Sequence, residues 1–336
     1  MTPPVIPGAS VVICVYTENR WDDIVAAVDS VRGQDVRPEE ILLVVDHNPT
    51  LLDRALRAFP PDVRVLANAQ HQGLSGARNT AVAAATGGVV VFLDDDATAR
   101  PRWLRALLAP YTDPDVVAVG GVARPRFPAG RPVLFPGGGT EPNATGELDW
   151  IVGCTYTGQP VARAEVRNLM GCNMSVRREV FDRVGGFAED LGRIGRNPLG
   201  CEETEFCIRA RQAYRRAGRA ARIVFEPAAQ VDHRVGADRV RWSYLRRRCW
   251  SEGLSKAAVA RLVGSDDALS TERAYVATVL PRAVVRELRA GRLVSAGAVV
   301  AALAATCAGY LRGTLPGATS RVRLPAAEAA PRSSRV

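Results

Sequence analysis

The sequence predicts an α/β protein with a Rossmann-like, mostly parallel sheet flanked by helices, followed by a C-terminal helical extension. Three observations predict it. Short apolar runs alternate with segments of helical periodicity over the first 120 residues, as in parallel βαβ units. Acidic residues directly follow two of these runs, at the strand ends where such sheets bind ligands. Beyond residue 240, Ala-rich helical segments replace the strands.

The expected strands of the first part are short and continuously apolar, which is typical of a sheet covered on both faces. They span residues 10–15, 41–45, 63–67, 89–93 and 116–120. The helices expected between them span residues 22–32, 51–58, 73–85 and 101–109.

The second part gives a weaker strand signal. Residues 123–146 are rich in Pro and Gly and indicate a loop. Strand-like pieces are expected at 150–155 and 223–225, and helices at 177–184, 202–218, 240–260 and onward to about 313. The last twenty residues are expected to be disordered.

Composition excludes several classes of protein. Apolar residues are 47% and charged residues 24% of the chain, which is ordinary for a globular protein. The net charge of +9 raises the question of a nucleic-acid partner. However, the only lysine is Lys256, so an Arg-rich and Ala-rich composition explains the charge better, and no nucleic-acid partner is expected.

The cysteines and the N-terminus indicate a reducing compartment. Seven scattered cysteines without a C-x-x-C pair argue against a disulfide framework or a zinc site. The first ten residues lack the basic and apolar regions of a signal peptide. The expected location is the cytoplasm, with peripheral contact at the inner face of the membrane as a further expectation.

Residues 293–311 contain no charge, which is nearly the length of a membrane span. Their Ala, Gly, Ser and Thr content favours a buried or interfacial helix instead. Nearby arginines suit an anionic lipid surface. The alternative is a helical pair packed on the main domain.

Three acids, Asp94–Asp96, directly follow the apolar run at 89–93. An Asp-x-Asp pair (the DxD pattern) offers hard oxygen ligands to Mg²⁺ or Mn²⁺, which can bridge a diphosphate. The alternative interpretation is a solvated acidic turn.

An ordered set of motifs now identifies a resemblance. The motifs are VVICVYTENRW at 11–21, ILLVVD at 41–46, GLSGARN at 73–79, VVVFLDDD at 89–96, GCNMSVRREVFDRVGGF at 171–187, LGCEETEFCIRARQAYRRAG at 199–218 and VDHRV at 231–235. Over roughly residues 9–255 the chain resembles family-two glycosyltransferases of the GT-A fold. The resemblance implies an inverting, metal-dependent transfer from a nucleoside-diphosphate sugar, UDP favoured, to a hydroxyl-bearing acceptor that is a glycan, a lipid-linked molecule or a small molecule.

The resemblance also implies a domain division. An N-terminal tail covers residues 1–8, and the GT-A domain covers 9–240. Its nucleotide-binding half is 9–122 and its acceptor half 123–240. A helical region at 241–315 and a disordered tail at 316–336 follow.

The donor and metal sites are carried over residue by residue. Asp96 is implied as the direct ligand of Mn²⁺ or Mg²⁺, with His233 as a third ligand beside Asp94. Residues implied to bind the nucleotide sugar are Val15, Tyr16, Glu18, Asp46, Arg78, Asp94, Asp95, Gly171 and Asn173. Among these, Asp46 is implied to bind the base, and Gly171 and Asn173 to wall the sugar. Arg78 has a structural ion pair as its alternative.

The catalytic base is implied at the start of the helix expected over 202–218. Glu203 matches the base position, and Glu202 is the second candidate. Acids in a first helical turn also complement the helix dipole, which is the structural alternative. For the acceptor, Trp150 and Tyr156 are candidate apolar platforms or core residues. Arg196 is expected in a loop that binds a diphosphate or an anionic acceptor.

One non-enzymatic alternative remains at this point. The chain could be a basic peripheral-membrane or nucleic-acid-binding protein that retains a catalytically dead transferase fold. The joint presence of Asp94, Asp96, Glu203 and His233 argues against it.

Overall fold

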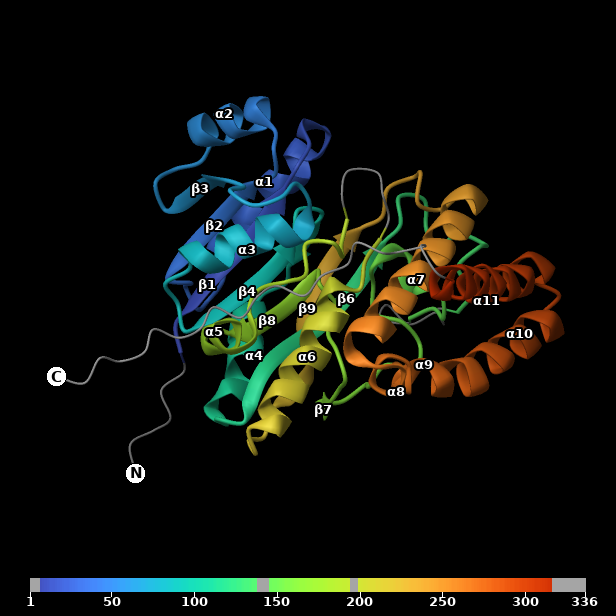
Figure 1. Ribbon diagram of the computed structural model, residues 1–336. Coiled ribbons are helices and arrows are strands. Elements are labelled where there is room, and N and C mark those ends of the chain that lie inside the picture. Colours follow the sequence, from blue (N-terminus) through green and yellow to red (C-terminus); the bar gives the residue numbers. More distant parts are fainter. Residues whose placement is uncertain (1–6, 138–144, 194–198, 316–336) are drawn as a thin grey trace.

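The computed structural model describes residues 7–137, 145–193 and 199–315 (Figure 1). A single mixed sheet forms its centre, in the spatial order β3-β2-β1-β4-β8-β6-β9-β5, with β7 beside β9. The strands are β1 (Ala9–Val15), β2 (Glu40–Val45), β3 (Val63–Ala67), β4 (Val89–Asp94), β5 (Ala97–Ala99), β6 (Val116–Arg126), β7 (Ala164–Glu165), β8 (Asn173–Arg177) and β9 (Arg222–Arg234).

Helices cover both faces of the sheet and extend beyond one end of it. They are α1 (Trp21–Arg32), α2 (Pro49–Ala58), α3 (Leu74–Ala84), α4 (Trp103–Leu108), α5 (Arg178–Val184), α6 (Glu202–Arg216), α7 (Trp242–Val263), α8 (Ser265–Ala268), α9 (Ser270–Ala274), α10 (Leu280–Arg289) and α11 (Leu293–Thr314). A π-helical segment (Tyr275–Val279) connects α9 to α10.

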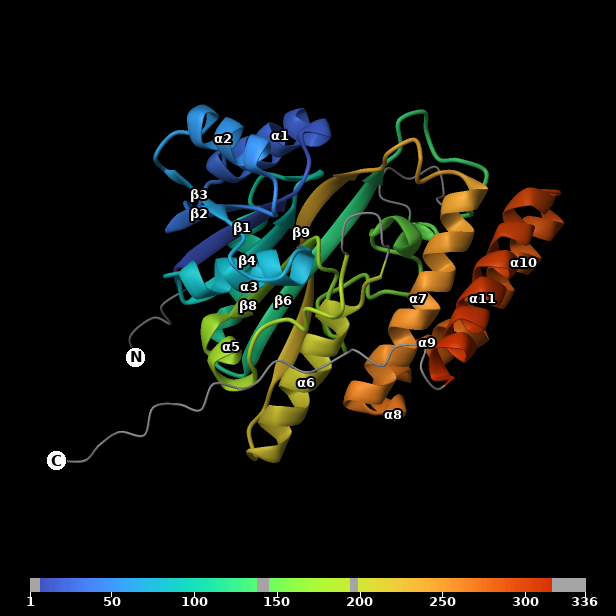
Figure 2. The same ribbon diagram turned by 45° about the horizontal axis from the view of Figure 1, so that its top comes forward.

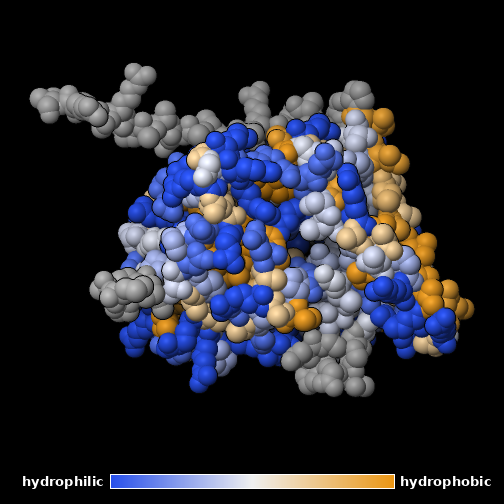
Figure 3. All heavy atoms as spheres, turned by 90° about the horizontal axis from the view of Figure 1, so that it is seen from below, coloured by the Kyte–Doolittle hydropathy of each residue, from blue (hydrophilic) through white to orange (hydrophobic). Residues whose placement is uncertain are grey.

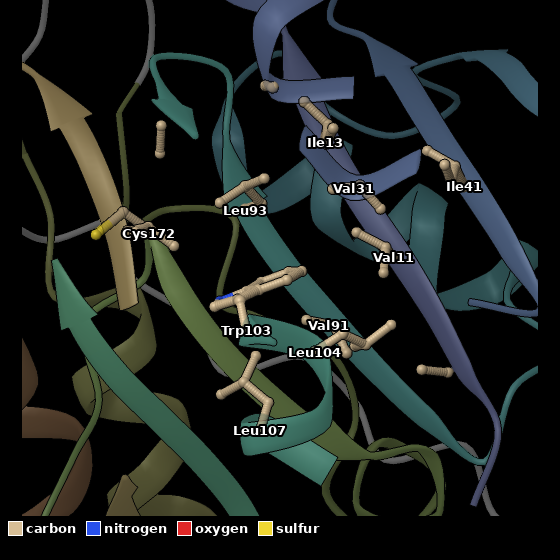
Figure 4. Packing of buried hydrophobic residues seen from close by; sticks show 14 of the residues in the cluster. Val11, Ile13, Val31, Ile41, Val91, Leu93, Trp103, Leu104, Leu107 and Cys172 are labelled. Atoms are coloured by element: carbon tan, nitrogen blue, oxygen red, sulfur yellow. The ribbon is translucent and has the colours of Figure 1, made fainter. Parts of the chain in front are cut away.

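The alternation of side chains along each central strand explains the layers. On β1, Val11 and Ile13 enter the core under α1, α2 and α4, and Val12 enters the core under α3, α5 and α6. Figure 4 shows the first of these cores, where Trp103 and Leu104 of α4 pack beside Val91 of β4. The predicted parallel arrangement is confirmed for these strands, since β1 pairs in parallel with β2 and β4, and β2 pairs in parallel with β3.

Three predictions beyond residue 120 need correction. The strand expected at 150–155 is a short 3₁₀ helix (Asp149–Val152), because buried Asp149 accepts from the Gly146 N–H and pairs with Arg131. The piece expected at 223–225 is the thirteen-residue strand β9. The third correction concerns Asn173, which the resemblance implies as part of the sugar wall and which is the first residue of β8. This strand is antiparallel to both β4 and β6.

The C-terminal helices α7, α10 and α11 lie side by side beyond the sheet (Figure 2). Two glycines let α7 and α11 approach closely. A Cβ on Gly253 of α7 would lie 2.1 Å from the Thr306 carbonyl oxygen, and one on Gly309 of α11 would lie 2.1 Å from that of Trp250. The segment expected to form a packed or interfacial helix is therefore a helix packed on the main body.

Helix α11 has the length and composition of a membrane span. Among the described residues it alone meets that test, with a mean hydropathy of 1.8 and 33% of the tested window buried. The terminal tails expected at 1–8 and 316–336 fall almost entirely outside the described residues.

Candidate active site

A cavity of about 420 Å³ opens at the carboxyl ends of the parallel strands. The end of β1 contributes Val15 and Tyr16, the end of β2 Asp46, and the end of β4 Asp94–Asp96. The segment between β9 and α7 closes the opposite side with Asp238 and Arg239. The strand-end position predicted for the binding site is thus the position of the cavity.

Asp94 and Asp96, which line this cavity, form a candidate metal group with His233. One ligand atom of each lies within 4.8 Å of the others. His233 Nε2 lies 3.2 Å from Asp96 Oδ1 and 3.9 Å from Asp94 Oδ2. Antiparallel pairing of β5 with β9 sets Ala97 opposite His233 and thereby fixes the histidine beside the β4 end.

Two arginines occupy the other side of Asp96. Arg20 lies 3.1 Å and Arg239 3.3 Å from Asp96 Oδ2, and Arg20 also binds Asp95 at 2.7 Å. Burial works to raise the pKa of Asp96, but His233, Arg239 and Arg20 outweigh it and hold that pKa below its usual value. Asp96 is therefore ionised, with Oδ1 turned toward the histidine.

The donor set fits a divalent cation. Burial lowers the pKa of His233, and the neutral imidazole is the form whose Nε2 can offer a lone pair to a cation. Two carboxylates with one imidazole suit Mn²⁺, and the carboxylates alone suit Mg²⁺. The ionised, arginine-supported Asp96 can contribute an oxygen without further deprotonation.

A second acidic pair lies at the start of α6. Glu202 Oε1 accepts from Arg78 at 2.9 Å, and the same guanidinium lies 3.6 Å from Asp94. Arg78 is 2% exposed and also donates to the Gly171 carbonyl at 2.9 Å. The guanidinium of Arg78 therefore connects the α6 start to the candidate metal group, which is the structural alternative set out for this residue.

Glu203 differs from Glu202 in its surroundings. It is half-buried and has no ion pair among the described residues. Burial, followed by the charge of Glu202, raises the pKa of Glu203 to about 8. A carboxyl group with a pKa near the working pH suits a general base, whereas Glu202 is neutralised by Arg78.

The remaining residues predicted to bind the donor differ in whether they line the cavity. Asp46 lines the cavity, but its carboxylate also accepts from the Gly73 N–H at 3.0 Å and from Asn68 at 2.7 Å. Glu18 opens a short 3₁₀ helix and does not line the cavity.

The structure contradicts the expected sugar-facing role of Asn173. Its side chain is fully buried and its amide groups are already bonded. Asn173 accepts from Trp103 Nε1 at 2.8 Å and donates to the Val122 and Ala229 carbonyls at 3.0 Å. It therefore joins α4, β6 and β9 instead of lining the site.

The candidate acceptor residues lie away from the cavity. Trp150 packs against the core between α7, α10 and α11. Tyr156 contacts Tyr275 edge to face, with ring centroids 5.3 Å apart. Both match the core alternative. Arg196 lies outside the described residues, whereas its neighbour Arg193 lines the cavity.

Sequence reasoning missed two residues that shape the site. Arg20 follows the first strand within a quoted motif, and Arg239 follows His233 by six residues. Neither position carries a local signal, because their partners are the acids of β4, far away in the chain. Arg239 Nη1 is buried and has no hydrogen-bond partner among the described residues, so it is available to an anion.

A buried charge network holds the loop that precedes α6. Cys201, with φ of 71°, takes the left-handed conformation directly before Glu202. Its thiol donates to Glu252 of α7 at 3.3 Å, and the Gly200 N–H donates to Ser255 at 3.1 Å. Lys256 binds Glu252 at 3.1 Å and Glu272 at 2.6 Å. Helix α7 therefore positions the start of α6.

Lys256→Met is expected to lower the free energy of unfolding by about 2 kcal/mol at pH 7. Buried Glu252 and half-buried Glu272 lose their shared cation and keep Arg248 and Arg167, respectively, as ion-pair partners. Lys256 and Arg248 outweigh burial and lower the pKa of Glu252 to about 2. The stabilisation is fully present above the ordinary glutamate pKa and is lost as the pH falls from that value through the folded-state pKa of about 2. The difference from wild type, measured by urea unfolding, should therefore shrink in acid.

Arg273→Met, at an exposed position of α9, is the matched control and should change stability by less than about 0.5 kcal/mol. An unfolding difference for Lys256→Met that does not vary with pH would show that packing, and not charge, is what the lysine supplies.

Comparison with known proteins adds three findings. The family model described as Glycosyl transferase family 2 matches residues 10–185. The chain is 34% identical over 285 residues to a glucosyl-dolichyl phosphate glucuronosyltransferase of Haloferax volcanii, covering 83% of this chain and 85% of that protein. A mannosyltransferase from Pyrobaculum calidifontis, solved with GDP-Man and Mn²⁺, matches with a TM-score of 0.56 and 18% identity, over 93% of this chain and 88% of that chain.

A second solved structure shares the fold over part of its length. GalNAc-T7, solved with UDP, GalNAc and Mn²⁺, matches with a TM-score of 0.50 and 18% identity. The match covers 74% of this chain and 48% of that one. The predicted GT-A architecture is confirmed by these two structures.

Proposed function

The chain belongs to glycosyl transferase family 2, and on this premise we propose that it transfers a sugar from a UDP-sugar to a lipid-linked acceptor with inversion at the anomeric carbon. The observation that carries the proposal is the position of two acidic groups on either side of Arg78. One group, Asp94, Asp96 and His233, suits a cation. The other group lies at the start of α6, where Glu202 pairs with Arg78 and the neighbouring Glu203 suits a base.

The proposed reaction is a single displacement. Glu203 takes the proton of the acceptor hydroxyl as its oxygen attacks the anomeric carbon, and the bond to the nucleoside diphosphate breaks on the opposite face. A divalent cation, when bound, supplies charge neutralisation for the departing diphosphate. Arg239 supports the same charge through its unpartnered Nη1.

The choice of nucleotide and the choice of acceptor class are supported by different observations. The sequence resemblance favours UDP as the nucleotide. The acceptor class is supported by the Haloferax volcanii relative, whose name gives glucosyl-dolichyl phosphate as the molecule on which it acts.

The test is a donor screen with UDP-, GDP- and dTDP-sugars, Mn²⁺ or Mg²⁺, and a polyprenyl-phosphate sugar as acceptor. Released nucleoside diphosphate and glycosylated lipid are both measured, and the anomeric configuration of the product is read by NMR. We expect lipid glycosylation from one UDP-sugar and its loss with EDTA. Transfer from GDP- or dTDP-sugars only, or retention of configuration, would overturn the corresponding part of the proposal.

A further inference from the structure

Helix α11 presents an exposed apolar face along its whole length. A series of exposed, uncharged residues recurs every three or four positions along α11 and its C-cap: Leu293, Gly297, Val300, Ala304, Cys307, Leu311 and Leu315. We call this set the apolar stripe. Leu293 is 69% and Leu311 66% exposed, at the two ends of the stripe. The opposite side of the helix, with Ala298 and Ala302, packs into the core.

Helix α10 extends this surface and adds positive charge. Val285 and Leu288 are exposed on it. Arg282 and Arg289 of α10 and Arg312 of α11 are exposed and have no ion pair among the described residues. In Figure 3, hydrophobic atoms run along the side of the molecule that α10 and α11 form.

Negative charge is missing from this surface. Glu287 is the one acidic residue between positions 280 and 315. It is 1% exposed and pairs with Arg286 and Arg292. The surface therefore combines exposed apolar side chains with uncompensated arginines, which is the pattern of helices that lie at an anionic membrane surface.

We propose that the apolar stripe and the neighbouring arginines bind the surface of an anionic bilayer, with α11 lying in the plane of the interface. The close contacts of Gly253 and Gly309 hold α11 against α7, so crossing the bilayer would require breaking that packing. A symmetric pair of copies would bring the same unpaired arginines together, which disfavours self-association as the occupant.

The same arrangement orients the cavity. The first turns of α7 contribute Tyr244 and Arg247 to the cavity, and the later turns pack on α11. Docking through α11 would thus hold the cavity at a fixed distance from the lipid surface. The inference goes beyond the proposed glycosyl transfer, since vesicle binding is measured without donor or acceptor.

The experiment is flotation of the full chain with phosphatidylcholine vesicles that contain or lack phosphatidylglycerol. We expect flotation with the anionic vesicles only. The double variant Val300→Asp with Leu311→Asp should abolish flotation. Val300 is 56% and Leu311 66% exposed, so the fold can tolerate both changes. Arg282→Gln with Arg289→Gln should weaken partitioning about thirtyfold, because each arginine contributes about fivefold.

The control is Leu56→Asp, at an equally exposed apolar position of α2, which should float like the wild type. Thermal melting of each variant shows that it folds. Absence of flotation by the wild type, or unchanged flotation of the Asp variants, would overturn the inference. If the bound protein resisted extraction by alkaline carbonate, the inference would be overturned in favour of a spanning helix. If the protein did not bind vesicles but formed a dimer that Val300→Asp dissociates, it would be overturned in favour of self-association.

Discussion

Asp96→Asn is expected to lower kcat for sugar transfer about a thousandfold, because the amide removes the charge that a bound cation needs. Asp96 has a partner at each of its carboxylate oxygens. His233 faces one oxygen, and Arg20 and Arg239 face the other. The amide can still accept from the arginines, so the loss should concern the cation more than the fold. The measurement is kcat at saturating donor across a Mn²⁺ titration.

A measurement of Mn²⁺ affinity distinguishes a loss of cation binding from a loss of catalysis. Titration calorimetry with Mn²⁺ alone should show at least a tenfold weaker affinity for the variant. The matched control is Asp53→Asn on the exposed side of α2, which should leave kcat and Mn²⁺ affinity unchanged. Wild-type Mn²⁺ affinity in Asp96→Asn, together with lost activity, would contradict the assignment of Asp96 as a metal ligand.

The parts of the site that could be predicted share a local signal. Asp46 and Asp94–Asp96 directly follow buried apolar strands, so the order of the chain alone brings them to one edge of the sheet. The N-terminal strands could be predicted for the same reason, since β1, β2 and β4 are continuously apolar.

The parts that could not be predicted depend on contacts between distant segments. Strand β8 carries Asn173 and Ser175, whose polar groups are buried only because Trp103, Tyr111 and backbone carbonyls satisfy them. No apolar pattern marks such a strand. Arg239 meets Asp96 through the fold alone, so composition near either residue gives no sign of the pair.

Helix α7 connects three features that the sequence presents separately. Its first turns line the cavity, Glu252 and Ser255 hold the loop before α6, and Gly253 packs on α11. The single lysine of the chain lies within this helix and bridges the carboxylates of Glu252 and Glu272. Lys256 therefore has a specific structural position that the composition of the chain does not indicate.

Glu203→Gln is expected to lower kcat about a thousandfold with little change in donor affinity, because the amide cannot take the acceptor proton. The pH dependence follows from the raised pKa of about 8. A base acts when deprotonated, so wild-type kcat should rise with pH, reach half its maximum near pH 8 and level off above that. The residual activity of the variant should not follow this profile.

Glu203→Gln should raise the Tm of the protein although it lowers kcat. A carboxyl with a raised folded-state pKa stabilises the protein fully below its ordinary pKa, and that contribution is lost as the pH rises through about 8. Glu203→Gln removes this loss, so the Tm of the variant should exceed that of wild type by a margin that grows from pH 5 to pH 8. Glu179→Gln, in the exposed first turn of α5, should change neither kcat nor Tm. A lower Tm together with lost activity would assign Glu203 a structural role, and Glu202 would then be the base to test.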